Sequence, residues 1–185
     1  MTDRRAFLTR LAATAAGLAV SQKAVALGTP ASATARPPSD VALLNAALEL
    51  EHTAIFAYGV AAGSGLLSPG ALAAGGLFKG SHEAHCAALT GAIRELGGFP
   101  IAALKAYDLS AFELKTEVDV LRLVLFLEMK AAHTYQKALA QFRHRRLLDT
   151  AGRILGDEVG HAAALRAVLG KGPVAFYGQL DEGLE

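Results

Sequence analysis

The sequence has few of the residues that build disulfides and strands. Its 185 residues include one cysteine and no tryptophan. Cys86 has no partner for a disulfide within the chain, so the fold must be held by a packed core, and 52% of the residues are hydrophobic. Runs of β-branched residues are scarce, whereas alanine and leucine are abundant, which favours helices. We therefore expect one all-α domain.

Neither sign of charge dominates. The chain has 18 lysines and arginines against 17 aspartates and glutamates, which gives a formal net charge of +1. A chain so close to neutral has no long-range field that would attract nucleic acid or acidic lipid. We expect no nucleic-acid partner.

The N-terminal residues are typical of an export signal. Arg4 and Arg5 lie in a twin-arginine-type pattern, an apolar run from Leu11 to Val20 follows, and small residues before position 36 offer cleavage sites. That run has about ten residues, whereas roughly 20 are needed to span a bilayer, so we expect no stable membrane anchor. The sequence predicts a twin-arginine-type signal peptide at residues 1–35 and export by the twin-arginine machinery to a periplasmic or extracellular location.

The rest of the chain divides into a folded domain at residues 36–172 and a C-terminal tail at residues 173–185. Helical periodicity is found in four segments of the domain, which are residues 40–60, 78–97, 116–142 and 151–169.

Capping and turn residues show how these segments are connected. Ser68 with Pro69 marks the start of the second helix, Thr116 with Asp119 marks the start of the third, and the basic stretch 143–146 forms a tight, solvated turn before the fourth. Short connections make the first two helices antiparallel, and likewise the last two. The link between the pairs can extend to roughly 60 Å and so can cross a bundle of about 37 Å. We expect a four-helix bundle with one long crossover connection between helices 2 and 3.

Each helical segment places ionisable residues in an apolar seam. In the last segment Glu158 and His161 lie on the same face as Ile154 and Leu165, because the steps are of three and four residues. A buried charge is costly unless it is paired or bound to a metal. The six residues found in this way are Glu51, His82, His85, Glu128, Glu158 and His161.

The six residues are expected to meet in one layer. Glu51 and His82 lie at about equal distances from the first turn, and Glu128 and Glu158 at about equal distances from the turn between the last two helices. Imidazole ligands disfavour an all-oxygen Ca²⁺ or Mg²⁺ site and suit iron, copper, zinc or nickel. The spacing therefore predicts a metal site in the core.

Several segments resemble the ferritin-like superfamily. They are ELEHTAIFAY, SHEAHCAAL followed by LGGFP, the helix around Glu128, and GDEVGHAAAL, and together they cover about residues 40–170. The similarity is to bundles of the bacterioferritin and rubrerythrin type and to exported bacterial ferritin-like proteins. In that superfamily a glutamate from each of two helices and a Glu-x-x-His pair from each of the others bind two iron or manganese ions. The resemblance implies metal ligands at Glu51, His85, Glu128, Glu158 and His161, with Tyr58 beside the bound cofactor.

The sequence departs from this pattern at His82. The resemblance implies glutamate at this position, so the second helix has His-x-x-His and only three carboxylates remain. Two divalent cations with three carboxylates leave a net charge of +1, which calls for an added anion or the loss of one metal. His82 is therefore expected as a ligand or as a neighbour of the ligands, and the site as holding one or two ions.

The function expected from this resemblance is that of an exported metalloprotein. Iron or manganese would react with dioxygen or peroxide, as in an oxidase, peroxidase or catalase-like oxidoreductase, and zinc or copper is less favoured. The alternatives are a non-catalytic metal store or carrier, and a metal-free helical module that kept the fold. The sequence is compatible with a monomer or a homo-oligomer. His52, His133 and His144 lie off the seams and are expected to be solvated.

Overall fold

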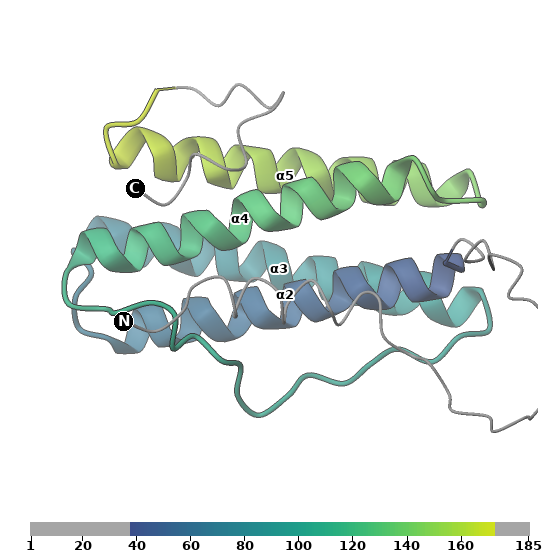
Figure 1. The fold of residues 1–185 in the computed structure, drawn as a ribbon, viewed down its shortest axis with the longest axis horizontal. Coiled ribbons are helices and arrows are strands. Elements are labelled where there is room, and N and C mark those ends of the chain that lie inside the picture. The colour runs from purple at the N-terminus through teal and green to yellow at the C-terminus, as the bar shows by residue number, and fades with distance from the viewer. Residues whose placement is uncertain (1–37, 173–185) are drawn as a thin grey trace, which may run out of the picture.

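The computed structural model describes residues 38–172, which form four α-helices (Figure 1). They are α2 (Asp40–Gly63), α3 (Pro69–Glu95), α4 (Glu117–Leu139) and α5 (Arg146–Val168). There is no strand in this part of the chain, so the all-α prediction is confirmed. None of these helices is both long enough and apolar enough to cross a membrane. The predicted signal peptide and C-terminal tail lie outside the described residues.

The four helices form two antiparallel pairs, α2 with α3 and α4 with α5 (Figure 1). Residues 96–116 connect the pairs and run the length of the bundle along its outer side. The Asn45 side chain of α2 anchors this connection, because it donates to the carbonyl of Phe99 at 3.1 Å and accepts from the backbone N–H of Ile101 at 2.9 Å. Farther along, the Tyr107 ring packs on Phe56 with their centroids 5.6 Å apart. The predicted crossover between the second and third helices is therefore confirmed.

The helices begin where the capping residues predicted. The Ser68 hydroxyl accepts from the backbone N–H of Ala71 at the start of α3, and Pro69 occupies the first helical position. Thr116 and Asp119 form a reciprocal capping box at the start of α4. Because these caps satisfy N–H groups that the helix itself leaves unpaired, they fix where α3 and α4 start.

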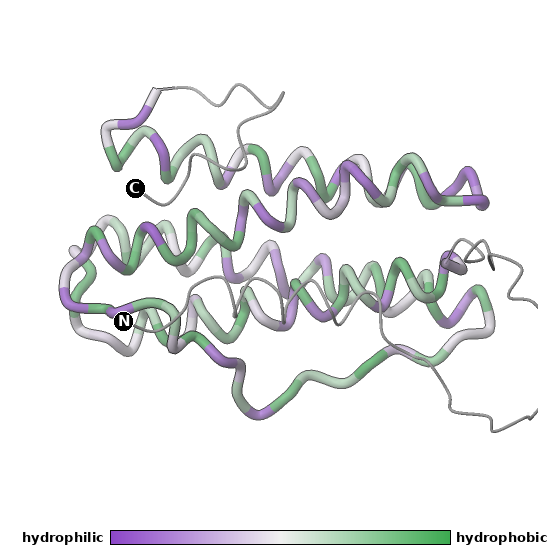
Figure 2. Tube along the Cα trace, viewed as in Figure 1, coloured by the Kyte–Doolittle hydropathy of each residue, from purple (hydrophilic) through white to green (hydrophobic). Residues whose placement is uncertain are grey.

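The turn between α4 and α5 begins earlier than the sequence predicted. Helix α4 ends at Leu139 rather than near residue 142. Buried Asp40, the first residue of α2, accepts from the backbone N–H groups of Arg143 and His144 at 3.0 and 2.9 Å and from the His144 ring at 2.6 Å. Burial raises the pKa of Asp40, but these hydrogen bonds outweigh it and lower the pKa below its ordinary value. They tie the turn, which is strongly hydrophilic in Figure 2, to the opposite helix pair.

The core contains two larger apolar clusters at opposite ends of the bundle and a smaller third one, against which residues of the α3–α4 connection pack. Near the α4–α5 turn the cluster contains Leu44, Leu48, Leu89, Ile93, Tyr135, Leu147 and Ile154. Near the α2–α3 turn it contains Tyr58, Val120, Leu121, Val124, Leu125 and Leu165. The residues predicted as metal ligands occupy the intervening turns of all four helices. A polar layer thus lies between two apolar ones.

Candidate metal centre

All six residues that the seams predicted are brought together in this polar layer. None has more than 8% of its surface exposed, and His82 and Glu158 have none. The spacing of three residues in each pair, His82 with His85 and Glu158 with His161, places both members on the inner face of α3 or α5. Helices α2 and α4 each contribute one glutamate, Glu51 and Glu128.

The imidazole ring of His82 lies at the middle of the layer. Its Nδ1 atom is 2.7 Å from Glu51 Oε2, and its Nε2 atom is 3.2 Å from Glu128 Oε1. Nδ1 is also 3.6 Å from Glu158 Oε1. One ring therefore meets carboxylates from three helices, and its two nitrogens face different ones.

The other two histidines lie beside His82. His85 Nδ1 is 3.0 Å from Glu158 Oε1 and 3.4 Å from Glu51 Oε2. His161 Nδ1 is 3.3 Å from Glu128 Oε2. His85 thus lies between the α5 and α2 carboxylates, and His161 lies beside the α4 carboxylate.

These contacts define two overlapping groups of metal-capable side chains. The first group is Glu51, His82, His85 and Glu158, and the second is His82, Glu128, Glu158 and His161. Within each group, one potential ligand atom per residue lies within 4.8 Å of the others. His82 and Glu158 belong to both groups, so the two groups overlap within one layer.

Two tyrosines orient the glutamates of α2 and α4 reciprocally. Tyr58 of α2 donates to Glu128 Oε1 of α4, and Tyr135 of α4 donates to Glu51 Oε1 of α2 at 2.5 Å. Each tyrosine is seven positions after the glutamate of its own helix. Burial, together with the neighbouring carboxylates, raises the pKa of both phenols, so both remain protonated donors.

Opposite charges balance within the metal-free layer. Burial disfavours the imidazolium form, but hydrogen bonds to carboxylates outweigh it and raise the pKa of His82 and of His85 to about 10. Burial also disfavours the carboxylates, yet the histidines hold the pKa of Glu51 and of Glu128 below its ordinary value. Two imidazolium rings therefore face two carboxylates.

Glu158 is the residue that this network leaves unsatisfied. Its pKa is raised to about 9, because burial and the neighbouring carboxylates of Glu128 and Glu51 raise it more than the contact with His85 lowers it. Neither carboxyl oxygen has a well-aligned hydrogen bond among the described residues, although His85 Nδ1 lies 3.0 Å from one of them. A buried polar group without a partner costs roughly 1–3 kcal/mol. A cation in the layer would supply the missing partner.

The donor set also fits a transition metal. Three carboxylates and three imidazoles form the polar layer, and each of the two overlapping groups combines oxygen with nitrogen donors. Iron, manganese, zinc and copper accept such mixtures, whereas Ca²⁺ and Mg²⁺ prefer oxygen alone. The residues present are therefore compatible with a metal site.

Cys86 and the remaining histidines lie outside both groups. Cys86 Sγ is 3.5 Å from His52 Nδ1, and burial raises the pKa of the thiol to about 12, so it stays protonated. The expectation that His52 and His133 are solvated was wrong, since both side chains are half-buried. The His144 side chain is 56% exposed, as expected, but pairs with Asp40.

Asp157 is a neighbour of the site that the seam pattern missed. Its carboxylate lies 3.1 Å from His85 Nε2, and its side chain is 60% exposed. It was missed because it is one position before Glu158 and so lies about 100° away around the helix. The adjacent acidic pair, Asp157 and Glu158, was the available signal: one member is buried in the layer and the other is at its edge.

Comparisons with known proteins agree with this fold. A family model described as a ferritin-like domain matches residues 39–171. No curated protein matches the chain. The solved crystal structure of a conserved hypothetical protein from Mycobacterium tuberculosis is similar, with a TM-score of 0.66 and 23% sequence identity, over 74% of this chain and 94% of that chain. At this level of identity the similarity shows the fold alone.

We predict that the metal-free protein loses stability as the pH rises from about 6.5 to about 10. The raised pKa values of His82 and His85 give a contribution to stability that is complete below pH 6.5 and is lost as the pH passes about 10. The raised pKa of Glu158 acts in the same direction between about 4.5 and about 9, because the unfolded chain releases this proton first. Thermal unfolding of chelator-treated protein should show Tm falling by at least about 5 °C across this range.

The His82→Gln variant is the control for this pH dependence. This variant lacks one of the three groups with a raised pKa, which are His82, His85 and Glu158. Its Tm should therefore be lower at pH 6.5 and should fall less steeply as the pH rises to about 10. A wild-type Tm that stays flat or rises across the range would contradict this distribution of protons.

Proposed function

The chain belongs to the ferritin-like domain family, and on that premise we propose that it is an exported metalloprotein that binds one or two iron or manganese ions in the bundle core. We propose further that the bound metal reacts with dioxygen or peroxide. The observation that supports metal binding best is buried Glu158, whose two oxygens have no aligned partner although three histidines and two further carboxylates surround them.

The two overlapping groups give each residue a part in the proposed site. Glu51 with His85 would hold one ion, and Glu128 with His161 the other. His82 and Glu158 would contact both positions. Binding would displace the protons that the metal-free layer carries on His82, His85 and Glu158, because a ligand must offer a free lone pair.

A bound iron or manganese ion supplies the redox chemistry, and the protein supplies its surroundings. Tyr58 and Tyr135 hold the Glu128 and Glu51 carboxylates in place through their hydroxyl groups. The apolar clusters above and below the layer keep bulk water away from it, which strengthens charge interactions inside. His85 with the exposed Asp157 links the layer to solvent, so this pair is the proposed route by which protons leave.

A metal-free helical module is the second candidate, and one observation favours it. His82 pairs with Glu51 and with Glu128, and both of these carboxylates also accept from a tyrosine, so most of the layer is satisfied without any ion. In this alternative Glu158 stays protonated, as its raised pKa permits. Metal analysis separates the two candidates.

We predict that protein purified after export contains tightly bound iron or manganese, and that Glu128→Ala and Glu158→Ala bind it at least about ten-fold more weakly. Each of these substitutions removes a buried carboxylate that belongs to a ligand group. His133→Ala is the matched control, because His133 is half-buried on α4 but lies outside both groups, and its metal content should be unchanged. Elemental analysis after exhaustive dialysis measures all four proteins.

The same preparations test the proposed reactivity. Turnover of hydrogen peroxide that depends on bound metal would support an oxidoreductase, whereas full metal content without turnover would indicate a store or carrier. Absence of iron, manganese, zinc and copper from the wild type would exclude both and leave the metal-free module.

We predict that His82→Glu raises the metal content toward two ions per chain. A fourth carboxylate in the position shared by both groups would neutralise a second divalent cation, which three carboxylates leave in excess. The metal-free variant should be less stable than the wild type, because it loses an imidazolium that balances Glu51 and Glu128. Metal content equal to or below that of the wild type would show that charge does not limit the number of ions.

We propose export by the twin-arginine machinery from the pattern at Arg4 and Arg5. Replacing both arginines with lysine should leave the full-length precursor inside the cell, since the pair identifies the signal to the export machinery. Immunoblots of periplasmic and cytoplasmic fractions measure this, and unchanged export of the double variant would contradict it.

A further inference from the structure

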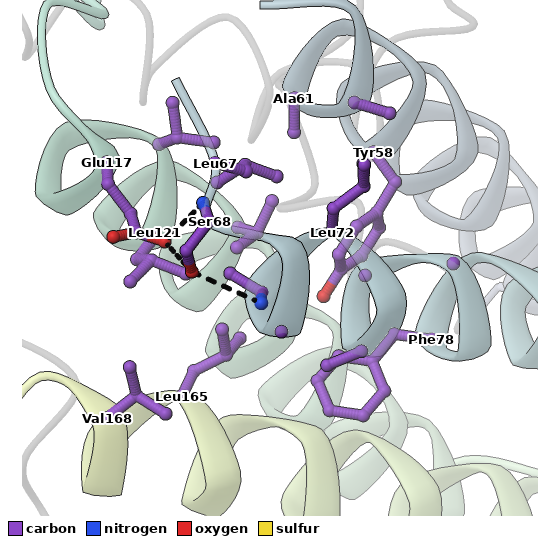
Figure 3. A pocket seen from close by; sticks show the side chains of 18 of the residues that line it. Tyr58, Ala61, Leu67, Ser68, Leu72, Phe78, Glu117, Leu121, Leu165 and Val168 are labelled. Carbon is purple, nitrogen blue, oxygen red and sulfur yellow. Dashed lines mark hydrogen bonds between the residues drawn. The ribbon is translucent and has the colours of Figure 1, made fainter. Parts of the chain in front are cut away.

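A cavity of about 290 Å³ lies at the end of the bundle formed by the α2–α3 turn. Figure 3 shows side chains from all four helices around it, including Tyr58 of α2, Phe78 of α3, Leu121 of α4 and Leu165 of α5. Half-exposed Leu72 and largely exposed Val168 also line it, so its opening to solvent is apolar.

Small residues keep this space empty. Helix α3 lines it with Gly70, Gly75 and Gly76, and alanines of α2, α3 and α5 line it as well. A Cβ atom added at Gly70 or Gly76 would meet nothing within 4 Å, and one added at Gly75 would meet only the Tyr58 ring, at 3.6 Å. Glycine within a helix is less stabilising than alanine, so this helix gives up stability where the cavity lies.

The charged groups at the cavity already have partners. Lys79 forms an ion pair with Glu83 at 2.6 Å. Glu117 accepts from the backbone N–H of Ser68 at 2.9 Å and from its hydroxyl at 2.6 Å. Both charged side chains are thus paired within the chain, and most of the lining is aliphatic or aromatic. This lining is complementary to a molecule without charge.

The inner wall of the cavity is also a wall of the candidate metal centre. The Tyr58 ring lines the cavity while its hydroxyl donates to Glu128. The Phe78 ring lines it as well and stacks on His161, with their centroids 4.2 Å apart. A molecule in the cavity would therefore be separated from the polar layer by these two rings.

We propose that the cavity is a binding site for a small, neutral, apolar molecule of about ten carbon atoms or fewer. An apolar cavity of about 150 Å³ accommodates benzene, so one about twice as large has room for two fused rings or a short aliphatic chain. The site needs no metal in order to bind, because its walls are formed by side chains alone. This inference goes beyond the proposed function, and either can fail without the other.

Binding of naphthalene to the full chain tests the proposal. Its fluorescence is easily followed because the protein has no tryptophan. The wild type should bind one equivalent saturably, and 1-octanol should displace it at concentrations at least about ten-fold below those needed with octanoate. No saturable binding would overturn the proposal, and so would equal displacement by the alcohol and the carboxylate. Naphthalene binding that weakens as the protein concentration rises would also overturn it, because it would mean that a second copy of the chain covers the opening.

Two alanines of α3 provide matched variants. Ala71 lines the cavity, so Ala71→Leu should weaken naphthalene binding at least ten-fold, whereas the exposed Ala73 does not line it and Ala73→Leu should have no effect. Gly76→Leu provides a second filled cavity if Ala71→Leu folds poorly, as judged by helix content and Tm. Equal binding by the wild type and a folded cavity-filling variant would place the ligand elsewhere.

A separate experiment tests whether the bound molecule lies beside the candidate metal centre. In protein loaded with Mn²⁺, the proton resonances of bound naphthalene should broaden strongly, and in protein loaded with diamagnetic Zn²⁺ they should not. Binding with no broadening in protein shown to contain Mn²⁺ would overturn the proximity. Binding by protein that takes up no metal would leave this site in place and remove the proposed metalloprotein function instead.

Discussion

The constraint on which this structure depends is the burial of six ionisable side chains in one layer between two apolar clusters. An unpaired charge at such a depth is not tolerated, so each group must be neutralised by a proton, a partner or an ion. His82 satisfies this requirement for two helices at once, because its two nitrogens face Glu51 and Glu128. Polar contacts, as well as the packing of leucines, therefore connect α2, α3 and α4.

The two tyrosines extend this constraint from the layer to the apolar clusters. Tyr58 belongs to one cluster and Tyr135 to the other, yet each hydroxyl reaches a carboxylate on the opposite helix. A shift of α2 along α4 would break both hydrogen bonds together. The two tyrosine–glutamate hydrogen bonds thus define the register of α2 against α4, two antiparallel helices that are separated in the sequence by α3 and the long connection. They also hold the carboxylates ready for a cation without requiring one.

The sequence predicted the elements that depend on local pattern, namely the helices, the capping residues and the six ionisable residues of the seams. It did not predict which residues bond to which. Tyr58 was expected beside the cofactor, but the hydrogen bonds that Tyr58 and Tyr135 exchange between α2 and α4 depend on the register of the bundle. Asp157 was missed because it is off the seam, and the end of α4 was misplaced because Asp40, about a hundred residues away in sequence, captures the following turn. The cavity was beyond prediction because it is a space that glycines and alanines of separate helices leave empty only once those helices are packed.

The histidine at position 82 accounts for the stability of the layer without metal. A glutamate there would place four carboxylates in one dry volume, and several would have to remain protonated unless cations were present. With imidazole instead, two positive rings balance Glu51 and Glu128, and Glu158 alone keeps its proton. The bundle can therefore fold before any ion arrives. Histidine in place of glutamate also removes one negative charge that could neutralise a second cation. At position 82, a residue that lets the bundle fold without metal therefore disfavours the binding of two ions.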